Sequence, residues 1–350
     1  MSEAVLFTLL TFLTNVLFGA ISAAFLLRLN QRWAYPPWPL ALIGMGLGPY
    51  LMTVMLYYPM ALWEDLPVPV LIAFPVLFFA ALAWQAGKGW SILVDLLGTI
   101  PRLLADRSMW FFLLGSAMIM FITIIFLANK PLVDHDVLEY AIQGRIFLRD
   151  GHIPYDQFRF DASSGFHYVG LHGFSFPLLF TWEGLLGNVF GVSSDLWARS
   201  MTMWYGWLLV AFVWAILRGI DRWMAVAGGI ALTSSLAFLF MFTVYHLDSY
   251  RIFFFTVSVA AFIALFRAPS LERALFLALL CGAVSFIHSI GAILTGVLWF
   301  VVAVMLPVPL LQRSKWIAYC IGVMLAAGAV HYVVEVLFGT GWIFQDIIWY

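Results

Sequence analysis

The chain has little charge. Only 10% of its 350 residues are Asp, Glu, Lys or Arg, whereas 64% are hydrophobic. A net charge of −1 leaves no basic surface to neutralise phosphates, which argues against nucleic acid as a partner. Cysteine is scarce too: Cys281 and Cys320 lie in apolar runs and suggest neither a disulfide framework nor a zinc site. The N-terminal residues lack the basic start of a cleavable signal peptide, so we expect the first helix to be retained.

Long apolar runs dominate what is present. Several approach or exceed the roughly 20 residues that a helix needs to cross the hydrocarbon core of a bilayer. We therefore predict an all-α, polytopic helical membrane protein with about ten transmembrane helices. The predicted ranges are 4–27, 40–60, 68–86, 109–128, 196–217, 223–244, 250–266, 274–290, 291–306 and 316–337. The break between the eighth and ninth depends on Ser289 and Gly291 alone.

The distribution of Lys and Arg predicts the orientation. With the N-terminus outside, most of the 17 basic residues fall in cytoplasmic loops and most of the 18 acids fall outside. We expect a bacterial cytoplasmic (inner) membrane protein with its active site facing outside. Residues 1–108 would form an N-terminal three-helix membrane segment, and 109–350 a core of about seven transmembrane helices that includes an outer loop, 129–192.

Two further stretches are predicted to lie along the membrane. Residues 90–107 mix apolar and charged side chains around Pro101, which suits an amphipathic segment on the cytoplasmic face. A span at 174–191 would move every later basic loop outside, against the distribution of Lys and Arg. We therefore predict that 174–191 lies on the outer surface, with Glu183 facing water.

A polar island at 130–172 interrupts the apolar chain. It holds Asp134 and Asp136 directly after a predicted span, followed by Glu139 and Tyr140. A helix over 134–149 would put Asp136, Glu139 and Tyr140 on one face, and Gly151 with Pro154 would end it. Crowded carboxylates suit general-base catalysis on a hydroxyl or amine. An ordinary hydrated loop explains the same composition, and the residues alone leave that alternative open.

Other polar residues are predicted to lie at the same membrane face. Asp248 and Arg251 precede a span, and the Arg251 guanidinium could hold a phosphate oxygen. His288 is predicted at the outer end of a helix, and His331 and Glu335 share a face near the end of another. A lone histidine in an apolar helix is more often a packing residue. Transporters usually carry ionisable groups near the bilayer midplane. In this chain the polar residues gather at one membrane face instead, which favours an enzyme acting on a lipid-linked substrate.

Residues 109–340 carry an ordered series of motifs. They are Asp134-His135-Asp136, Tyr140, Gly151-His152-Ile153-Pro154-Tyr155, His172-Gly173-Phe174-Ser175-Phe176-Pro177-Leu178, Phe190-Gly191-Val192-Ser193, Ala198-Arg199 and Tyr245 with Asp248. This series resembles the polytopic glycosyltransferases of the C superfamily (GT-C), which include protein O-mannosyltransferases and aminoarabinose transferases. The chain departs from that family in its three preceding helices, in His172-Gly173 where members have His-Pro-Pro, and in the absence of a lysine near His288.

The resemblance implies a sugar transferase with a polyprenyl-phosphate-linked donor and a lipid, glycan or protein acceptor. It implies Asp136 or Asp134 as the catalytic carboxylate. The candidate substrate-binding residues are Glu139, Tyr140, Tyr155, His172, Asp248, Arg251, His288, His331 and Glu335. The resemblance points to no certain cofactor, since many members of that family need no metal, but Asp134 and Asp136 could hold a divalent cation, Mg or Mn, through oxygen ligands. The alternatives are a non-catalytic lipid-glycan binding subunit, a flippase, or a structural scaffold.

Overall fold

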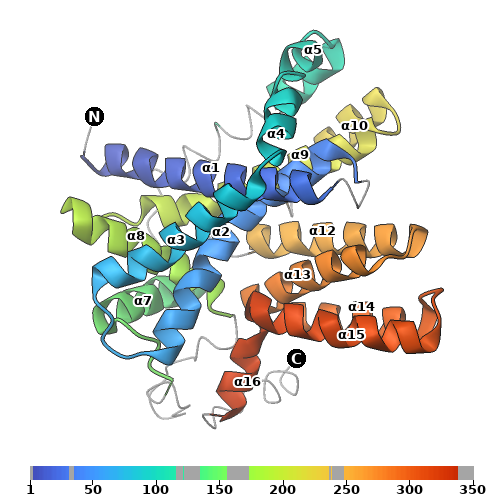
Figure 1. The fold of residues 1–350 in the computed structure, drawn as a ribbon. Helices are drawn as coiled ribbons and strands as arrows, with labels where there is room; N and C mark the ends of the chain where they lie inside the picture. The colour runs from blue at the N-terminus through green and yellow to red at the C-terminus, as the bar shows by residue number, and fades with distance from the viewer. Residues whose placement is uncertain are drawn as a thin grey trace. The chain divides into compact units, whose positions relative to one another are not determined.

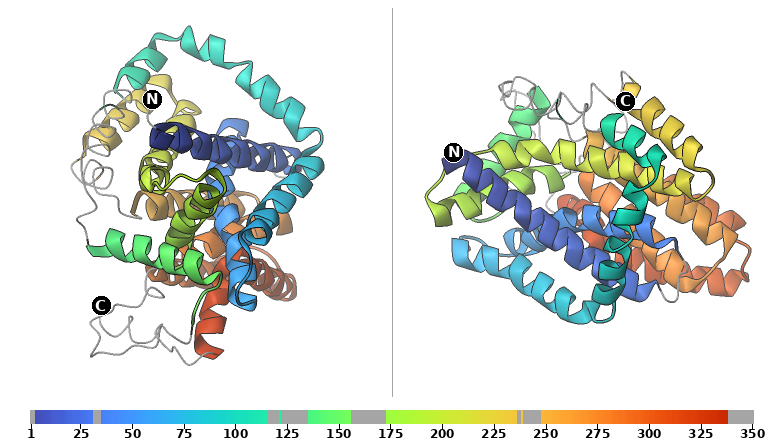
Figure 2. Two further views of the ribbon diagram at one scale, coloured as in Figure 1. Left: turned by 90° about the vertical axis from the view of Figure 1, so that its left-hand side faces the viewer. Right: turned by 90° about the horizontal axis from the view of Figure 1, so that it is seen from above.

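The structure is a computed structural model that describes residues 3–30, 35–115, 121, 135–155, 173–235, 238 and 248–337. All the elements in these ranges are helices (Figures 1 and 2). They are α1 (Glu3–Leu29), α2 (Pro37–Leu62), α3 (Val68–Ala86), α4 (Gly89–Leu97), α5 (Ile100–Leu104), α7 (His135–Asp150), α8 (Ser175–Phe190), α9 (Leu196–Arg218), α10 (Arg222–Ser234), α12 (Asp248–Arg267), α13 (Leu271–Ile287), α14 (Ser289–Met305), α15 (Leu310–Met324), the π-helical turn η2 (Leu325–Ala329) and α16 (Val330–Leu337).

Six described helical runs are long and apolar enough to cross a bilayer. They are Val5–Leu29, Pro37–Leu62, Val68–Ala86, Leu196–Arg218, Asp248–Arg267 and Leu310–Val334. The chain therefore has the helices of an integral membrane protein, as its composition predicted. Helices α13 and α14 are each 17 residues long and meet at His288, whereas the predicted boundary lies between 290 and 291. The predicted spans 109–128 and 223–244 lie partly outside the described residues, so a total of ten stays a prediction.

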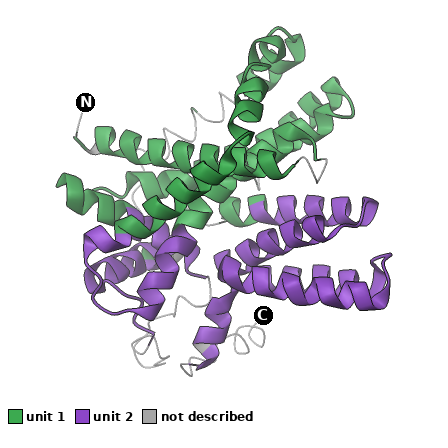
Figure 3. Ribbon diagram, in the orientation of Figure 1, with its two compact units in different colours: residues 1–52, 72–138, 183–253 green, residues 53–71, 139–182, 254–350 purple. Residues whose placement is uncertain are grey.

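The chain forms two compact units from interleaved segments (Figure 3). Unit 1 comprises 1–52, 72–138 and 183–253, and unit 2 comprises 53–71, 139–182 and 254–350. In unit 1, α1 and α2 approach closely where both carry small residues. A Cβ on Gly48 would lie 2.3 Å from the backbone nitrogen of Gly19, so only glycine permits this approach. The predicted division at residue 108 follows membrane topology and stays a prediction.

Glu183 is buried in unit 1, and the prediction that it faces water is wrong. Its side chain is 1% exposed. Its two carboxyl oxygens accept hydrogen bonds from the backbone N–H groups of Trp197 (3.0 Å) and Ala198 (3.2 Å) in the first turn of α9. The first N–H groups of a helix have no partner within it, and the carboxyl oxygens of Glu183 accept from two of them. Helix α8 itself forms as predicted, and its 16 residues are too few for a typical span.

In unit 2, α13, α14 and α15 pack side by side (Figures 1 and 2). The run from α15 to α16 is broken by η2, where Gly328 adopts a φ of 108°. A π turn releases backbone carbonyls from the regular helical pattern. The Tyr58 hydroxyl of α2 donates to two of them, Leu325 O (3.1 Å) and Ala326 O (2.8 Å). Unit 2 therefore holds this kink with a side chain from another helix.

Candidate functional site

Helix α7 confirms the helix predicted for the polar island. It runs from His135 to Asp150, and Gly151, with a φ of 66°, ends it. Asp136 lies in its first turn, although its side chain, like that of Glu335 in α16, is not among those described. Asp134 and His172 lie outside the described residues. The direct geometry of the predicted catalytic carboxylates therefore stays a prediction.

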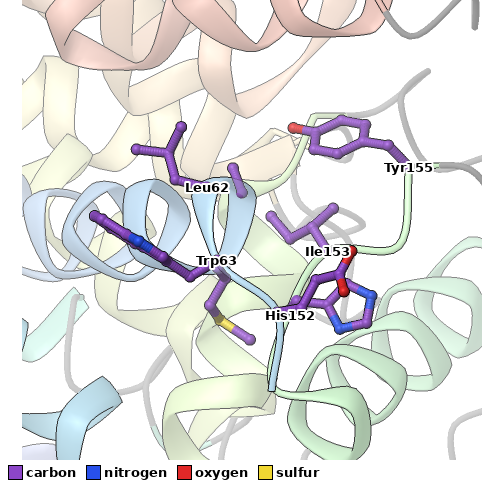
Figure 4. A pocket seen from close by; sticks show the side chains of 8 residues that line it. Leu62, Trp63, His152, Ile153 and Tyr155 are labelled. Atoms are coloured by element: carbon purple, nitrogen blue, oxygen red, sulfur yellow. The ribbon is translucent and has the colours of Figure 1, made fainter. Parts of the chain in front are cut away.

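The residues after α7 return to the end of α2 within unit 2. The Ile153 N–H donates to the carbonyl of Met60 at 2.8 Å. This contact forms one side of an open hollow of about 360 Å³ (Figure 4). Its described lining residues are Met60, Ala61, Leu62, Trp63, Glu64, His152, Ile153 and Tyr155. The topology expected from the sequence assigns both contributing segments, the loop after α2 and the polar island, to the same membrane face.

Buried aromatic side chains form the wall behind the hollow. The hydroxyls of Tyr155 and Tyr57 share a hydrogen bond of 2.7 Å. The ring of Phe174 lies 5.7 Å from those of Tyr155, Tyr57 and His331, measured between centroids. Phe174 therefore contacts both Tyr155 and His331, two residues predicted to bind substrate. Both are almost completely buried, at 3% and 0% exposed.

His331 makes one hydrogen bond within the described residues. Its Nδ1 lies 2.8 Å from the carbonyl oxygen of Gly328, so Nδ1 carries the proton and donates. The Nε2 atom is buried and has no hydrogen-bond partner among the described residues. The carbonyl that orients the ring belongs to the π turn, so the kink sets the position of this imidazole. His331 is thus buried against the ring of Phe174, and direct contact with a donor phosphate stays a prediction.

His288 has a local structural role. It lies between α13 and α14, and its Nδ1 accepts a hydrogen bond from the backbone N–H of Ile290 at 3.0 Å. The imidazole therefore caps α14 in the way that Asn or Ser usually caps a helix. Its ring is 6% exposed. Sequence reasoning predicted the position of His288 at a helix end but did not predict the cap.

The remaining described candidates are distributed between the two units. Asp248 and Arg251 form an ion pair at the start of α12, within unit 1. In unit 2, Tyr140 is fully buried and packs edge-on against Phe176 of α8, at 5.3 Å between centroids, while Glu139 is half-buried. Arg251 therefore already has a carboxylate partner, and Tyr140 contributes to the packing of α7 on α8.

The charged residues at the end of α7, just before the lining residue His152, are paired with each other. The Arg149 guanidinium binds the Asp150 carboxylate, with Nη2 and Oδ2 2.8 Å apart, and this hydrogen bond lowers the pKa of Asp150. The His152 Nδ1 lies 2.9 Å from the Asp150 carbonyl oxygen and donates to it. Glu64 is exposed at the lining of the hollow. Within the described residues, no group of three or more His, Cys, Asp or Glu side chains could hold a metal ion.

Sequence reasoning did not single out Tyr57, Trp63 or Glu64. The available signal was the Trp63-Glu64 pair in a short loop between two spans, on the face predicted to hold the polar island. Only the fold shows that this loop meets Ile153 and Tyr155. Comparisons of the chain with protein-family models, with curated proteins and with solved structures found no match.

Proposed function

We propose that this protein is a membrane glycosyltransferase of the GT-C type. It would transfer a sugar from a polyprenyl-phosphate-linked donor to an acceptor on the extracytoplasmic face of a bacterial cytoplasmic membrane. The observation that carries the proposal is the hollow at the end of α2, lined by Trp63, Glu64, His152 and Tyr155. A hollow that carries polar side chains at the end of a long apolar helix suits a substrate whose tail lies in the bilayer and whose head group lies outside it.

Asp136 is the proposed general base, with Asp134 as its neighbour. The first turn of α7, where Asp136 lies, favours a negative charge because its backbone N–H groups point toward the helix start. An ionised carboxylate can accept the proton of an acceptor hydroxyl or amine as that group attacks the sugar carbon, and the lipid phosphate leaves with the bonding electrons. Mg or Mn at Asp134 and Asp136 would add Lewis-acid stabilisation of that phosphate.

The other candidates would bind and orient the substrates. Tyr155 forms part of the hollow, and Glu139 follows Asp136 by one helical turn in α7. Arg251 binds the Asp248 carboxylate through Nη2, and its other guanidinium N–H groups could donate to a phosphate oxygen. We propose phosphate binding for Arg251 through these groups.

The test is sugar transfer by the purified protein in proteoliposomes that contain a radiolabelled polyprenyl-phosphate sugar. Asp136→Asn should lower the rate by at least about a hundredfold, because a general base contributes roughly 10²–10⁴-fold. Asp95→Asn, a change at an exposed carboxylate on α4, is the matched control and should keep the wild-type rate. Full activity in a folded Asp136→Asn protein would refute the assignment of the base. Donor binding without transfer to any acceptor would favour the lipid-glycan binding subunit instead.

A further inference from the structure

The hollow at the end of α2 combines an apolar floor with an aromatic and acidic rim. Met60, Ile153 and Tyr155 form the floor and are each 3% exposed or less. At the rim, the Trp63 indole is 51% exposed and the neighbouring Glu64 carboxylate is exposed as well. Figure 4 shows Trp63 and His152 on different segments beside Ile153, so the two chain segments together shape the hollow.

The charge of the lining residues indicates whether the hollow suits the sugar ring or the phosphate of a lipid-linked sugar. No Lys or Arg is among the described lining residues, and the Arg149 guanidinium nearby is bound to Asp150. A phosphate in the hollow would therefore meet the Glu64 carboxylate with no cation among the described lining residues, and like charges repel one another. The lining thus disfavours the phosphate end.

The same lining suits a sugar ring. One face of a pyranose carries C–H groups that pack against an aromatic ring, and its edge carries hydroxyls that donate to a carboxylate such as Glu64. An amino group on the sugar would add charge attraction to Glu64 and a cation–π contact with Trp63. A volume of about 360 Å³ lies at the small end of the roughly 300–1,000 Å³ range of ligand pockets, as a compact head group requires.

We propose that this hollow is the subsite for the sugar ring, that it selects neutral and amino sugars over anionic ones, and that the phosphate binds elsewhere. The inference rests on the proposed function for its choice of a sugar as the ligand. It goes further by assigning specificity to Trp63 and Glu64, which lie in the loop between α2 and α3.

The test is binding rather than activity. The full chain is placed in lipid nanodiscs, because maltoside detergents carry glucose rings that would compete. The probes are methyl glycosides of mannose, glucose and galactose, methyl glucosaminide, methyl glucuronide and inorganic pyrophosphate, observed by saturation-transfer NMR. At least one neutral or amino glycoside should bind, and neither the glucuronide nor pyrophosphate should compete with it.

Two pairs of variants locate the binding. Trp63→Ala should weaken glycoside binding about tenfold, the effect of removing an aromatic anchor, whereas Trp84→Ala, at a tryptophan of α3 that is 83% exposed, should not. Glu64→Gln should weaken binding of the amino glycoside more than that of the neutral ones. Asp65→Asn is its control, because Asp65 is not among the described lining residues and asparagine tolerates its φ of 54°.

The outcomes separate this inference from the proposed function. Glycoside binding lost in Trp63→Ala would support the subsite even if no transferase activity were found. Transfer activity together with unchanged glycoside binding in Trp63→Ala and Glu64→Gln would overturn the subsite and leave the proposed function intact. Absence of binding by every glycoside, or competition by pyrophosphate, would also overturn the inference.

Discussion

Replacement of Glu183 by glutamine should reverse the order of stability between variant and wild type as the pH rises. Burial raises the pKa of this carboxyl from 4.5 to about 8, despite the hydrogen bonds from Ala198 and Trp197, which lower it. Asp195 raises the pKa further, and Arg199 opposes that effect. The folded chain therefore keeps a proton that the unfolded chain loses between these two pH values.

The magnitude follows from the size of that pKa shift. Each unit corresponds to about 1.4 kcal/mol, so the stabilising effect that is present below pH 4.5 declines by about 5 kcal/mol as the pH rises to about 8. Glutamine stays neutral throughout and should not show this decline. Its carbonyl can accept only one of the two N–H groups that Glu183 binds, and the other loses its acceptor at a cost of about 1–3 kcal/mol.

The assay is thermal unfolding of purified protein in a fixed detergent at several pH values. At about pH 5 the wild type should be the more stable, and above about pH 8 Glu183→Gln should be the more stable. Asp95→Asn, at an exposed carboxylate, should keep the wild-type pH dependence. If the difference between wild type and Glu183→Gln does not change with pH, the two N–H donors keep the carboxylate ionised, and the argument that burial dominates is wrong.

Three further predictions concern other local features. Tyr58→Phe removes the donor to two carbonyls of the π turn and should lower the free energy of unfolding by about 1–3 kcal/mol; an unchanged thermal midpoint would contradict this role. Gly328→Ala should sharply reduce the yield of monodisperse protein in detergent, because a Cβ would lie 2.6 Å from the ring of Phe286 and the φ of 108° is strained for alanine. A wild-type yield would contradict the requirement for glycine at this kink. Hydrogen bonds from Ser108, with a smaller effect of Arg218, lower the pKa of Asp106, so the stability that this carboxylate contributes is lost as the pH falls. Asp106→Asn should therefore weaken the fall in thermal midpoint at acid pH. An unchanged fall would refute this role.

Local features of the sequence were sufficient to predict several of the helices. The predicted helix over 134–149 became α7, ended by Gly151, because a glycine with positive φ stops a helix through backbone geometry alone. The break between α13 and α14 lies at His288, close to the boundary predicted between 290 and 291. Apolar length predicted the membrane-spanning character of the long helices for the same reason: transfer of a segment into hydrocarbon depends on its own composition.

Contacts between distant segments were beyond these signals. The prediction for Glu183 failed because composition gives a carboxylate a preference for water but says nothing of the two N–H donors at the start of α9. Similarly, Trp63 and Glu64 looked like ordinary residues of an interfacial loop. Their place in a hollow depends on the hydrogen bond between Ile153 and Met60, which joins residues far apart in the sequence.

The sequence by itself thus determined that this is a helical membrane protein with one concentrated polar island, because hydropathy and helix-ending residues act locally. The tertiary structure alone decided which groups meet: Tyr155 and His331 lie against the ring of Phe174, and Glu183 binds α9. The physical reason is that burial and pairing are properties of the surroundings of a side chain, and only packing between segments supplies those surroundings.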